Sequence, residues 1–223
     1  MTKNEMAQLI DHTYLKPEAT KKEIDKLIAE AKEHNFKTIC VNSSWVKYAK
    51  SKLEGSSVGI TAVVGFPLGA MISQAKAHEA ELAIKHGADE IDMVIHIGKL
   101  KEQDYEYVLN DIKTVKKVMP HNILKVIVET ALLTKEEILQ VSEIVVKSGA
   151  EFIKTSTGFS YRGATLEDIV LMKSVVKDQI QIKAAGGIAN ANDLEMMYQA
   201  GATRFGTSRS ISIIQGTESK EGY

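Results

Sequence analysis

Cysteine is almost absent from this sequence: Cys40 is the only one among 223 residues. A single thiol excludes an internal disulfide, and it also excludes a CxxC metal cluster. The six histidines follow neither HxH nor HExxH spacing, so we expect no metal site in this protein. Cys40 itself can be interpreted as a small core residue or as a reactive thiol.

An excess of either charge is also missing, because 28 Lys and Arg residues face 29 Asp and Glu residues. The formal net charge of −1 predicts neither a nucleic-acid partner nor a membrane partner. No apolar run reaches the length of a signal peptide or a membrane span, so we expect a cytoplasmic protein. The length and the 44% hydrophobic content suffice for one large core.

Helix-like and strand-like segments alternate along the whole chain. Strands interleaved with helices predict a parallel sheet with right-handed crossovers. Thr20 and Thr134 precede two helical segments as N-caps, and Glu137 completes a capping box with Thr134. The expected strands cover residues 9–12, 36–41, 58–64, 90–95, 123–128, 150–153, 180–184 and 203–206, and the expected helices cover 20–34, 72–86, 103–118, 134–147, 165–177 and 191–199.

One short pattern occurs three times, at residues 87–92, 149–154 and 201–206. Each copy has Gly-Ala at a helix end, two variable positions, one apolar residue and then a candidate site residue. The copies are about two strand–helix units apart, which predicts a single-domain (β/α)8 TIM barrel of the α/β class over residues 1–215. Residues 216–223 are expected to form a flexible polar tail. An open doubly wound sheet is the alternative, but no GxGxxG follows an early strand.

Three ionisable residues, Asp92, Lys154 and Lys183, lie on predicted buried strands. In a barrel the carboxyl ends of the strands form the active face, so these side chains are expected to converge there. A second ammonium group near Lys154 would lower its pKa, and a neutral lysine can form a Schiff base with a carbonyl compound. Asp92 could then relay protons. A structural ion pair is the alternative for any one lysine, yet several unpaired buried charges would be costly.

Glycine-containing loops follow the seventh and eighth predicted strands, where barrel enzymes commonly bind a phosphate group. The segment 156–158, directly after Lys154, could close a third side of such a site. Ordinary loop chemistry is the alternative, since glycine is frequent in strand–helix turns. The predicted phosphate-binding residues are Thr157, Gly158, Gly186, Gly187, Gly206, Thr207 and Ser208.

Two further features of the predicted strands leave alternatives open. The cluster Asp11-His12-Thr13 can reach the mouth of the barrel or form a hydrogen-bonded group at the end of its strand. Lys125 lies within a strand and is expected to pair with a carboxylate, for which Glu129 and Asp92 are the candidates.

Together these motifs resemble those of the deoxyribose-phosphate aldolase family, and the resemblance runs nearly from end to end. It implies a (β/α)8 barrel and a class I aldolase that uses no metal and no cofactor. Such an enzyme reversibly joins acetaldehyde and glyceraldehyde 3-phosphate to give the phosphosugar 2-deoxyribose 5-phosphate. The matching segments are 9–16, 64–69, 90–94, 124–130, 152–158, 183–188 and 204–208.

The same resemblance implies roles for individual residues. Lys154 would form the Schiff base, while Asp92 and Lys183 would handle protons. Members of the family often end in a tyrosine that assists proton transfer at the enamine carbon, and Tyr223 is the last residue here. The resemblance also implies a homo-oligomer, either a dimer or a larger assembly.

The chain departs from the family pattern around the phosphate site. Ala189 stands where members often have an arginine, Ser208-Arg209 replaces paired serines, and residues 159–164 are usually smaller. We hypothesise that Arg209 or Arg162 supplies the missing positive charge. Two other functions stay open: a different Schiff-base enzyme such as a transaldolase, and a barrel that binds phosphosugars without catalysis.

Overall fold

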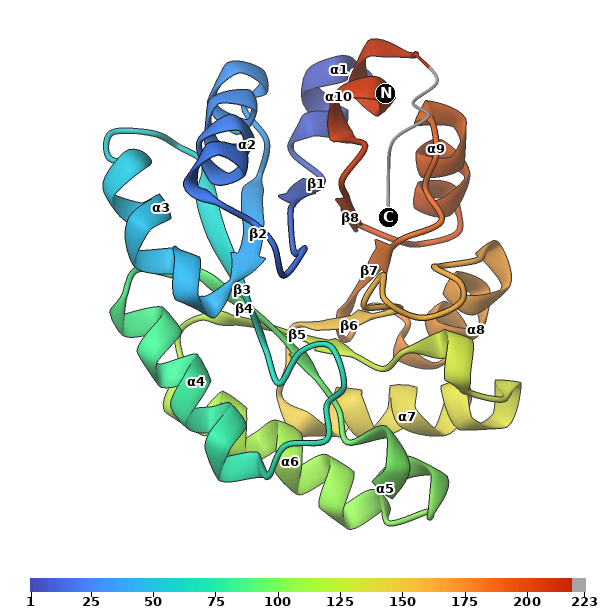
Figure 1. The fold of residues 1–223 in the computed structure, drawn as a ribbon. Coiled ribbons are helices and arrows are strands. Elements are labelled where there is room, and N and C mark those ends of the chain that lie inside the picture. The colour runs from blue at the N-terminus through green and yellow to red at the C-terminus, as the bar shows by residue number, and fades with distance from the viewer. Residues whose placement is uncertain (218–223) are drawn as a thin grey trace.

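The computed structural model describes residues 1–217 and contains a closed barrel of eight parallel strands. The strands follow one another around the barrel in sequence order, and the last pairs with the first (Figure 1). The predicted (β/α)8 TIM barrel is therefore confirmed. The strands are β1 (Ile10–Thr13), β2 (Thr38–Asn42), β3 (Gly59–Val64), β4 (Glu90–Val94), β5 (Ile123–Ile127), β6 (Phe152–Lys154), β7 (Gln181–Ala185) and β8 (Arg204–Thr207).

Helices surround the strands and cover the outside of the barrel (Figure 1). The two expected N-caps are present, because Thr20 and Thr134 each form a capping box with the glutamate three residues later. The α-helices are α1 (Lys3–Ala7), α2 (Lys21–His34), α3 (Val46–Lys52), α4 (Ser73–Lys85), α5 (Ile97–Lys101), α6 (Tyr105–Val118), α7 (Lys135–Ser148), α8 (Leu166–Val176), α9 (Ala191–Gln199) and α10 (Ser210–Gln215), and the 3-10 helices are η1 (Ser43–Trp45) and η2 (Thr130–Leu132).

Successive residues of each strand face opposite sides of the barrel wall. On β4, Ile91 and Met93 pack in the main hydrophobic core between strands and helices. Glu90 and Asp92 alternate with them and contact side chains of other strands inside the barrel. The wall thus separates an apolar outer layer from an interior that carries charge.

The sixth strand differs from its expected position. It begins at Phe152 and ends at Lys154, two residues later than the predicted start at residue 150. Gly149 caps α7 in a left-handed conformation with φ of 86°, and Ala150 and Glu151 connect it to the strand. The later start makes Lys154 the final residue of β6.

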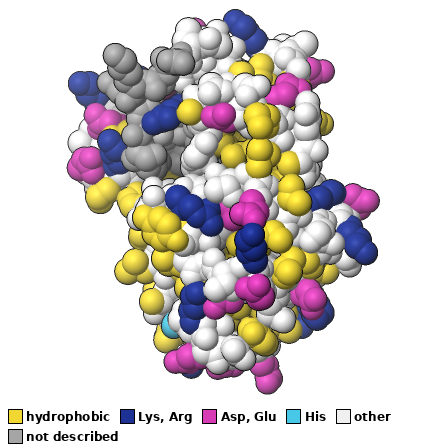
Figure 2. All heavy atoms as spheres, turned by 90° about the vertical axis from the view of Figure 1, so that its right-hand side faces the viewer, with side chains coloured by type: hydrophobic (Ala, Val, Ile, Leu, Met, Phe, Trp, Pro, Cys, Tyr) yellow, Lys and Arg dark blue, Asp and Glu magenta, His cyan; other side chains and the backbone are white. Residues whose placement is uncertain are grey.

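The outer surface near α8 combines apolar and charged side chains. Leu166 and Val170 on α8 and Met196 and Tyr198 on α9 are exposed. Figure 2 shows hydrophobic side chains on this side lying among Lys, Arg, Asp and Glu residues. Within residues 1–217, every helix is too short or too polar to cross a bilayer.

Candidate active site

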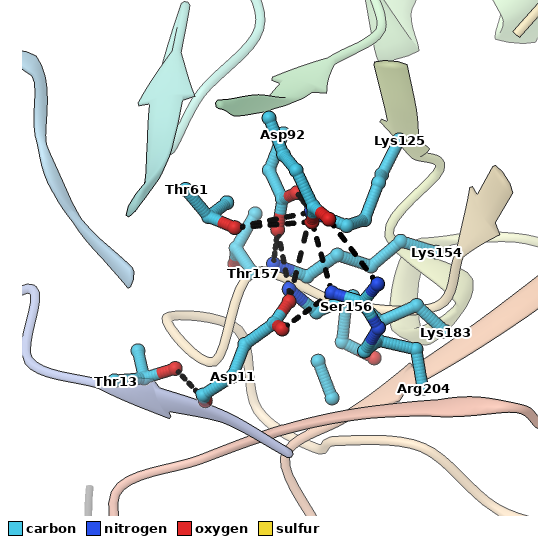
Figure 3. A network of polar contacts seen from close by, with 12 residues as sticks. Asp11, Thr13, Thr61, Asp92, Lys125, Lys154, Ser156, Thr157, Lys183 and Arg204 are labelled. Atoms are coloured by element: carbon cyan, nitrogen blue, oxygen red, sulfur yellow. Dashed lines mark hydrogen bonds and ion pairs between the residues drawn. The ribbon is translucent and has the colours of Figure 1, made fainter. Parts of the chain in front are cut away.

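The two lysines predicted at the barrel mouth lie side by side on neighbouring strands. Lys154 on β6 and Lys183 on β7 are paired in the strand register. Their Nζ atoms each lie 2.7 Å from the same oxygen, Oδ2 of Asp92 on β4 (Figure 3). All three side chains are buried. The structure therefore brings together the three residues that the sequence selected.

Asp92 also binds a third lysine through its other oxygen. Lys125 on β5 places its Nζ 2.8 Å from Asp92 Oδ1 and 2.6 Å from a carboxylate oxygen of Glu90. Of the two candidate partners for Lys125, Asp92 is confirmed and Glu129 is wrong. Glu129 lies beyond the end of β5 and accepts hydrogen bonds from Thr157 instead.

Glu90 and Arg204, the two charged side chains that complete this group, were not identified from the sequence. Arg204 on β8 lies 2.7 Å from Asp11 on the adjacent strand β1. It also lies 2.9 Å from Glu90 on β4, which is across the closed barrel. Asp11 in turn binds Lys183. We call the seven residues the interior cluster: Asp11, Glu90, Asp92, Lys125, Lys154, Lys183 and Arg204.

The interior cluster contains four basic residues and three acidic ones. If all were ionised, the cluster would hold one surplus positive charge in a buried environment, which is unfavourable. Loss of one proton from a lysine restores the balance. A single neutral amine is therefore the arrangement that these contacts favour.

The pKa shifts identify which amine that is. Burial lowers the pKa of Lys154, and Lys183 lowers it further, although Asp92 opposes both effects. The pKa of Lys183 is raised, because Asp11 and Asp92 together outweigh burial. Lys154 is thus the amine expected to be neutral. Burial has a larger effect on the pKa of Lys154 than the charge of Lys183 has.

A cavity of about 200 Å³ opens above these amines and includes Lys154 in its lining. Gly186 and Gly187, which follow β7, both have left-handed backbone conformations, with φ of 67° and 72°. All the predicted phosphate-binding residues line this cavity: Thr157, Gly158, Gly186, Gly187, Gly206, Thr207 and Ser208.

Two loops around the cavity pack backbone against backbone. A Cβ atom on Gly163 would lie 2.3 Å from the carbonyl carbon of Gly186, and one on Gly187 would lie 2.6 Å from the carbonyl oxygen of Ala164. These positions therefore require glycine. The contact fixes the loop after β6 against the loop after β7.

The hydroxyl residues after Lys154 are arranged differently from the prediction. Ser156 is fully buried and donates its hydroxyl hydrogen to Thr155, and it is not part of the cavity lining. Thr157 lines the cavity, but both its N–H and its O–H donate to Glu129. The third side of the cavity is thus formed by Thr157 and Gly158 without Ser156.

The two candidate arginines have different surroundings. Arg162 donates to Asp168 at 2.6 Å and to the carbonyl oxygen of Thr130 at 3.0 Å, and it does not line the cavity. Arg209 does line the cavity, beside Ser208. Of the two arginines, Arg209 is therefore the one that remains a candidate for binding the phosphate group.

Both interpretations of the cluster at the end of β1 apply in part. Asp11 faces the interior and Thr13 lines the cavity. The ring nitrogens of His12 lie 2.9 Å from the hydroxyl of Ser210 and 2.9 Å from a carboxylate oxygen of Glu30, so His12 belongs to a hydrogen-bonded group. Cys40 is buried, and burial raises the pKa of its thiol.

Two further predictions concern a metal ion and the tail. No group of three or more His, Cys, Asp and Glu side chains within residues 1–217 is arranged to hold a metal ion. The carboxylates of the interior cluster are bound by lysine and arginine instead. Tyr223 lies outside the described residues, as does most of the expected tail at 216–223.

Comparisons with known proteins agree with this geometry. Residues 5–212 match the model of the DeoC/LacD family aldolases. The deoxyribose-phosphate aldolase of Mycoplasmopsis synoviae is 66% identical over 219 residues, which cover 97% of this chain and 98% of the relative. A deoxyribose-phosphate aldolase of Mycoplasmopsis pulmonis is 61% identical over 98% of this chain and 100% of the relative.

A solved structure shows the same fold. The deoxyribose phosphate aldolase of Aeropyrum pernix superposes with a TM-score of 0.89 at 28% identity, covering 96% of this chain and 91% of the other. The barrel, the buried lysine pair and these matches lead to one conclusion. The chain belongs to the DeoC/LacD family of aldolases.

Proposed function

We propose that this chain is a deoxyribose-phosphate aldolase that uses Lys154 as its Schiff-base lysine. It reversibly cleaves 2-deoxy-D-ribose 5-phosphate to acetaldehyde and D-glyceraldehyde 3-phosphate. The observation that carries the proposal is the position of Lys154: its amine lies in the cavity lining and shares Asp92 Oδ2 with Lys183. The family and the names of the relatives support the reaction.

The first step follows from the protonation states of the interior cluster. Neutral Lys154 attacks C1 of the open-chain sugar, and loss of water gives an iminium ion. Asp92 can accept and return protons during this step because its carboxylate contacts both lysines. Lys183 stays charged, and its charge disfavours protonation of Lys154.

Carbon–carbon cleavage uses the iminium ion as an electron sink. Asp92, through a water molecule, takes the proton from the C3 hydroxyl while the C2–C3 bond breaks and glyceraldehyde 3-phosphate leaves. The remaining enamine is protonated at carbon by water held on Asp92 or by Tyr223. Hydrolysis of the resulting imine releases acetaldehyde and restores Lys154.

The remote phosphate binds where the glycine loops meet. The backbone of Gly187, the loop 206–208 and the positive charge of Arg209 suit a phosphate dianion, whereas the N–H of Gly186 donates to the carbonyl oxygen of Gly206. Binding at that end aligns C1 with Lys154, which converts binding energy into rate.

Borohydride reduction in the presence of acetaldehyde, followed by peptide mass mapping, tests the proposal. We expect a two-carbon adduct on Lys154, together with retro-aldol cleavage of 2-deoxyribose 5-phosphate. Acceptance of dihydroxyacetone in place of acetaldehyde would indicate a different aldolase or a transaldolase. Absence of both adduct and turnover would indicate a barrel that only binds phosphosugars, and an adduct on another lysine would reassign the nucleophile.

We also propose that the chain forms a homo-oligomer. The structure of the Aeropyrum pernix relative is described as tetrameric, and the exposed apolar residues Val170 and Tyr198 on α8 and α9 offer one surface for a second copy. Light scattering after size-exclusion chromatography tests this proposal, and a monomer mass would contradict it. The cytoplasmic location stays a prediction.

A further inference from the structure

Glu129 has a backbone conformation that is unusual for its residue type. It follows the end of β5 with φ of 56° and ψ of 66°, in the left-handed region that glycine prefers. Such strain in a residue with a side chain persists only where surrounding contacts enforce it, and it is concentrated at functional sites.

Backbone hydrogen bonds on both sides of Glu129 enforce this conformation. The N–H of Val128 donates to the carbonyl oxygen of Lys154 at 3.0 Å, and the N–H of Thr130 donates to that of Thr155 at 2.9 Å. The chain around Glu129 is thereby attached to the last residue of β6 and to the first residue of the loop that follows it. Its side chain is directed toward the same loop.

The carboxylate of Glu129 holds the next part of that loop. It accepts the N–H of Thr157 at 3.2 Å and also the hydroxyl hydrogen of Thr157. The Thr157 oxygen accepts the N–H of Phe159 at 3.0 Å, so the hydrogen bonds extend across Gly158. Thr157 and Gly158 line the cavity together with Lys154.

This carboxylate is also buried in an unusual way. Glu129 is 3% exposed, and within residues 1–217 no Lys, Arg or His side chain lies within 4.0 Å of its carboxylate oxygens. Burial raises the pKa of Glu129, although the hydrogen bonds from Thr157 and the charges of Lys154 and Arg162 oppose the shift. A carboxylate buried without a direct ion pair and a strained backbone at one residue are both unfavourable, so a purely structural role does not account for them well.

We propose that Glu129 is a positioning residue for the phosphate end of the substrate. It fixes Thr157 and Gly158 relative to Lys154 and beside Gly186, so that a phosphate group bound at the glycine loops places C1 of the sugar at the amine. The inference rests on the proposed function and adds to it a residue that the substrate does not touch.

Glu151 provides a matched control on the same pair of strands. It precedes β6 and accepts the N–H of Leu124 at 2.8 Å and the ammonium group of Lys116 at 2.6 Å. Like Glu129, it connects the β5 segment to the β6 segment, but it does so at the amino end of the barrel, away from the cavity. Its loss should affect stability without affecting the substrate.

The test compares the wild type with Glu129→Gln and Glu151→Gln in two reactions. One is cleavage of 2-deoxyribose 5-phosphate, which requires the phosphate end. The other is borohydride trapping of acetaldehyde on Lys154, which does not. For Glu129→Gln we expect KM for the phosphorylated sugar to rise about 10-fold, the typical effect of losing a hydrogen bond to a charged group, with trapping unchanged. For Glu151→Gln we expect both readouts to be unchanged.

An unchanged KM in Glu129→Gln, or a loss of trapping equal to the loss of cleavage, would overturn the inference. If Glu129→Gln does not fold by circular dichroism, Glu129→Asp replaces it, because it keeps the carboxylate but shortens its reach to Thr157. A KM increase without a trapping defect supports the inference there too, and an unchanged KM contradicts it. Failure of the wild type itself to cleave and to trap would instead reject the proposed function.

Discussion

Between α4 and α6, outside the barrel, Lys76 and Asp111 form a one-to-one ion pair with an N–O distance of 2.6 Å. Inside the barrel, four basic residues share three carboxylates. Both regions are buried, and burial lowers the pKa of Lys76 as well as that of Lys154. The numbers of charges differ, however: the outer pair is balanced when both residues are ionised, whereas the interior cluster is balanced only when one amine is neutral.

Access to substrate also separates the two lysines. Lys76 is fully buried, and its ammonium group donates to the carbonyl oxygen of Val94 at 2.9 Å and to Asp111. Both contacts connect elements of the fold. Lys154 lies in the lining of the cavity. Lys154 is a candidate nucleophile because it has two properties that Lys76 lacks. It belongs to a cluster with more basic than acidic residues, and it lines a cavity.

Replacement of the nucleophile should have the largest effect. Lys154→Met is expected to lower kcat/KM for 2-deoxyribose 5-phosphate on the order of 10⁴-fold or more and to abolish borohydride trapping, because no covalent intermediate can form. The matched control is Lys76→Met combined with Asp111→Leu, since this double variant also removes a buried lysine but leaves no buried carboxylate unpaired. Trapping that persists in Lys154→Met, or disappears in the double variant, would break the distinction between the two regions.

Removal of the neighbouring cation should have the next largest effect. In Lys183→Met the cluster retains three carboxylates and three basic residues, so Lys154 can remain protonated. We expect kcat/KM at pH 7 to fall by about 10²–10³-fold. The pKa of Lys154 should rise, so the rate of trapping should reach its half-maximum at a higher pH than in the wild type. If trapping in Lys183→Met reached its half-maximum at the same pH as in the wild type, burial alone would account for the lowered pKa of Lys154.

The rim of the cavity should contribute less than the interior cluster. Arg209→Ala is expected to raise KM for the phosphorylated sugar about 10-fold with little change in kcat, because it removes charge at the phosphate end only. Arg162→Ala should leave KM nearly unchanged and lower the thermal midpoint, since its guanidinium binds Asp168. The reverse pattern in steady-state kinetics would assign the phosphate to Arg162.

The outer ion pair should have the smallest effect on activity. The double variant Lys76→Met/Asp111→Leu is expected to keep kcat/KM within about twofold and to be neutral or up to ~4 kcal/mol more stable in urea unfolding. Lys76→Met alone should lose about 3–5 kcal/mol, because it leaves Asp111 buried without a partner. A large loss of kcat in the double variant would mean that the outer region also serves catalysis.

The strands and the lysine pair were predictable because they depend on local patterns. Apolar runs located each strand, and Lys154 and Lys183 are conspicuous because they interrupt those runs. Helix α3 was not predicted, since a seven-residue helix has few turns and depends on the packing of Val46 and Ala49.

The rest of the interior cluster required the closed barrel. Glu90 and Asp92 share a face by the two-residue period of a strand, so Glu90 could have been found from the sequence. Its contact with Arg204 could not, because it depends on β4 and β8 lying across the barrel from each other. The contact of Arg162 is local instead, because its partner Asp168 is placed by the first turn of α8.

The protonation state of Lys154 can be measured directly by titrating the ¹³Cε resonance of lysine in the wild type, assigned by its absence in Lys154→Met. We predict that this resonance titrates below the ordinary lysine pKa of about 10.4. Titration together with the surface lysines near that value would contradict the claim that the interior cluster keeps this amine neutral.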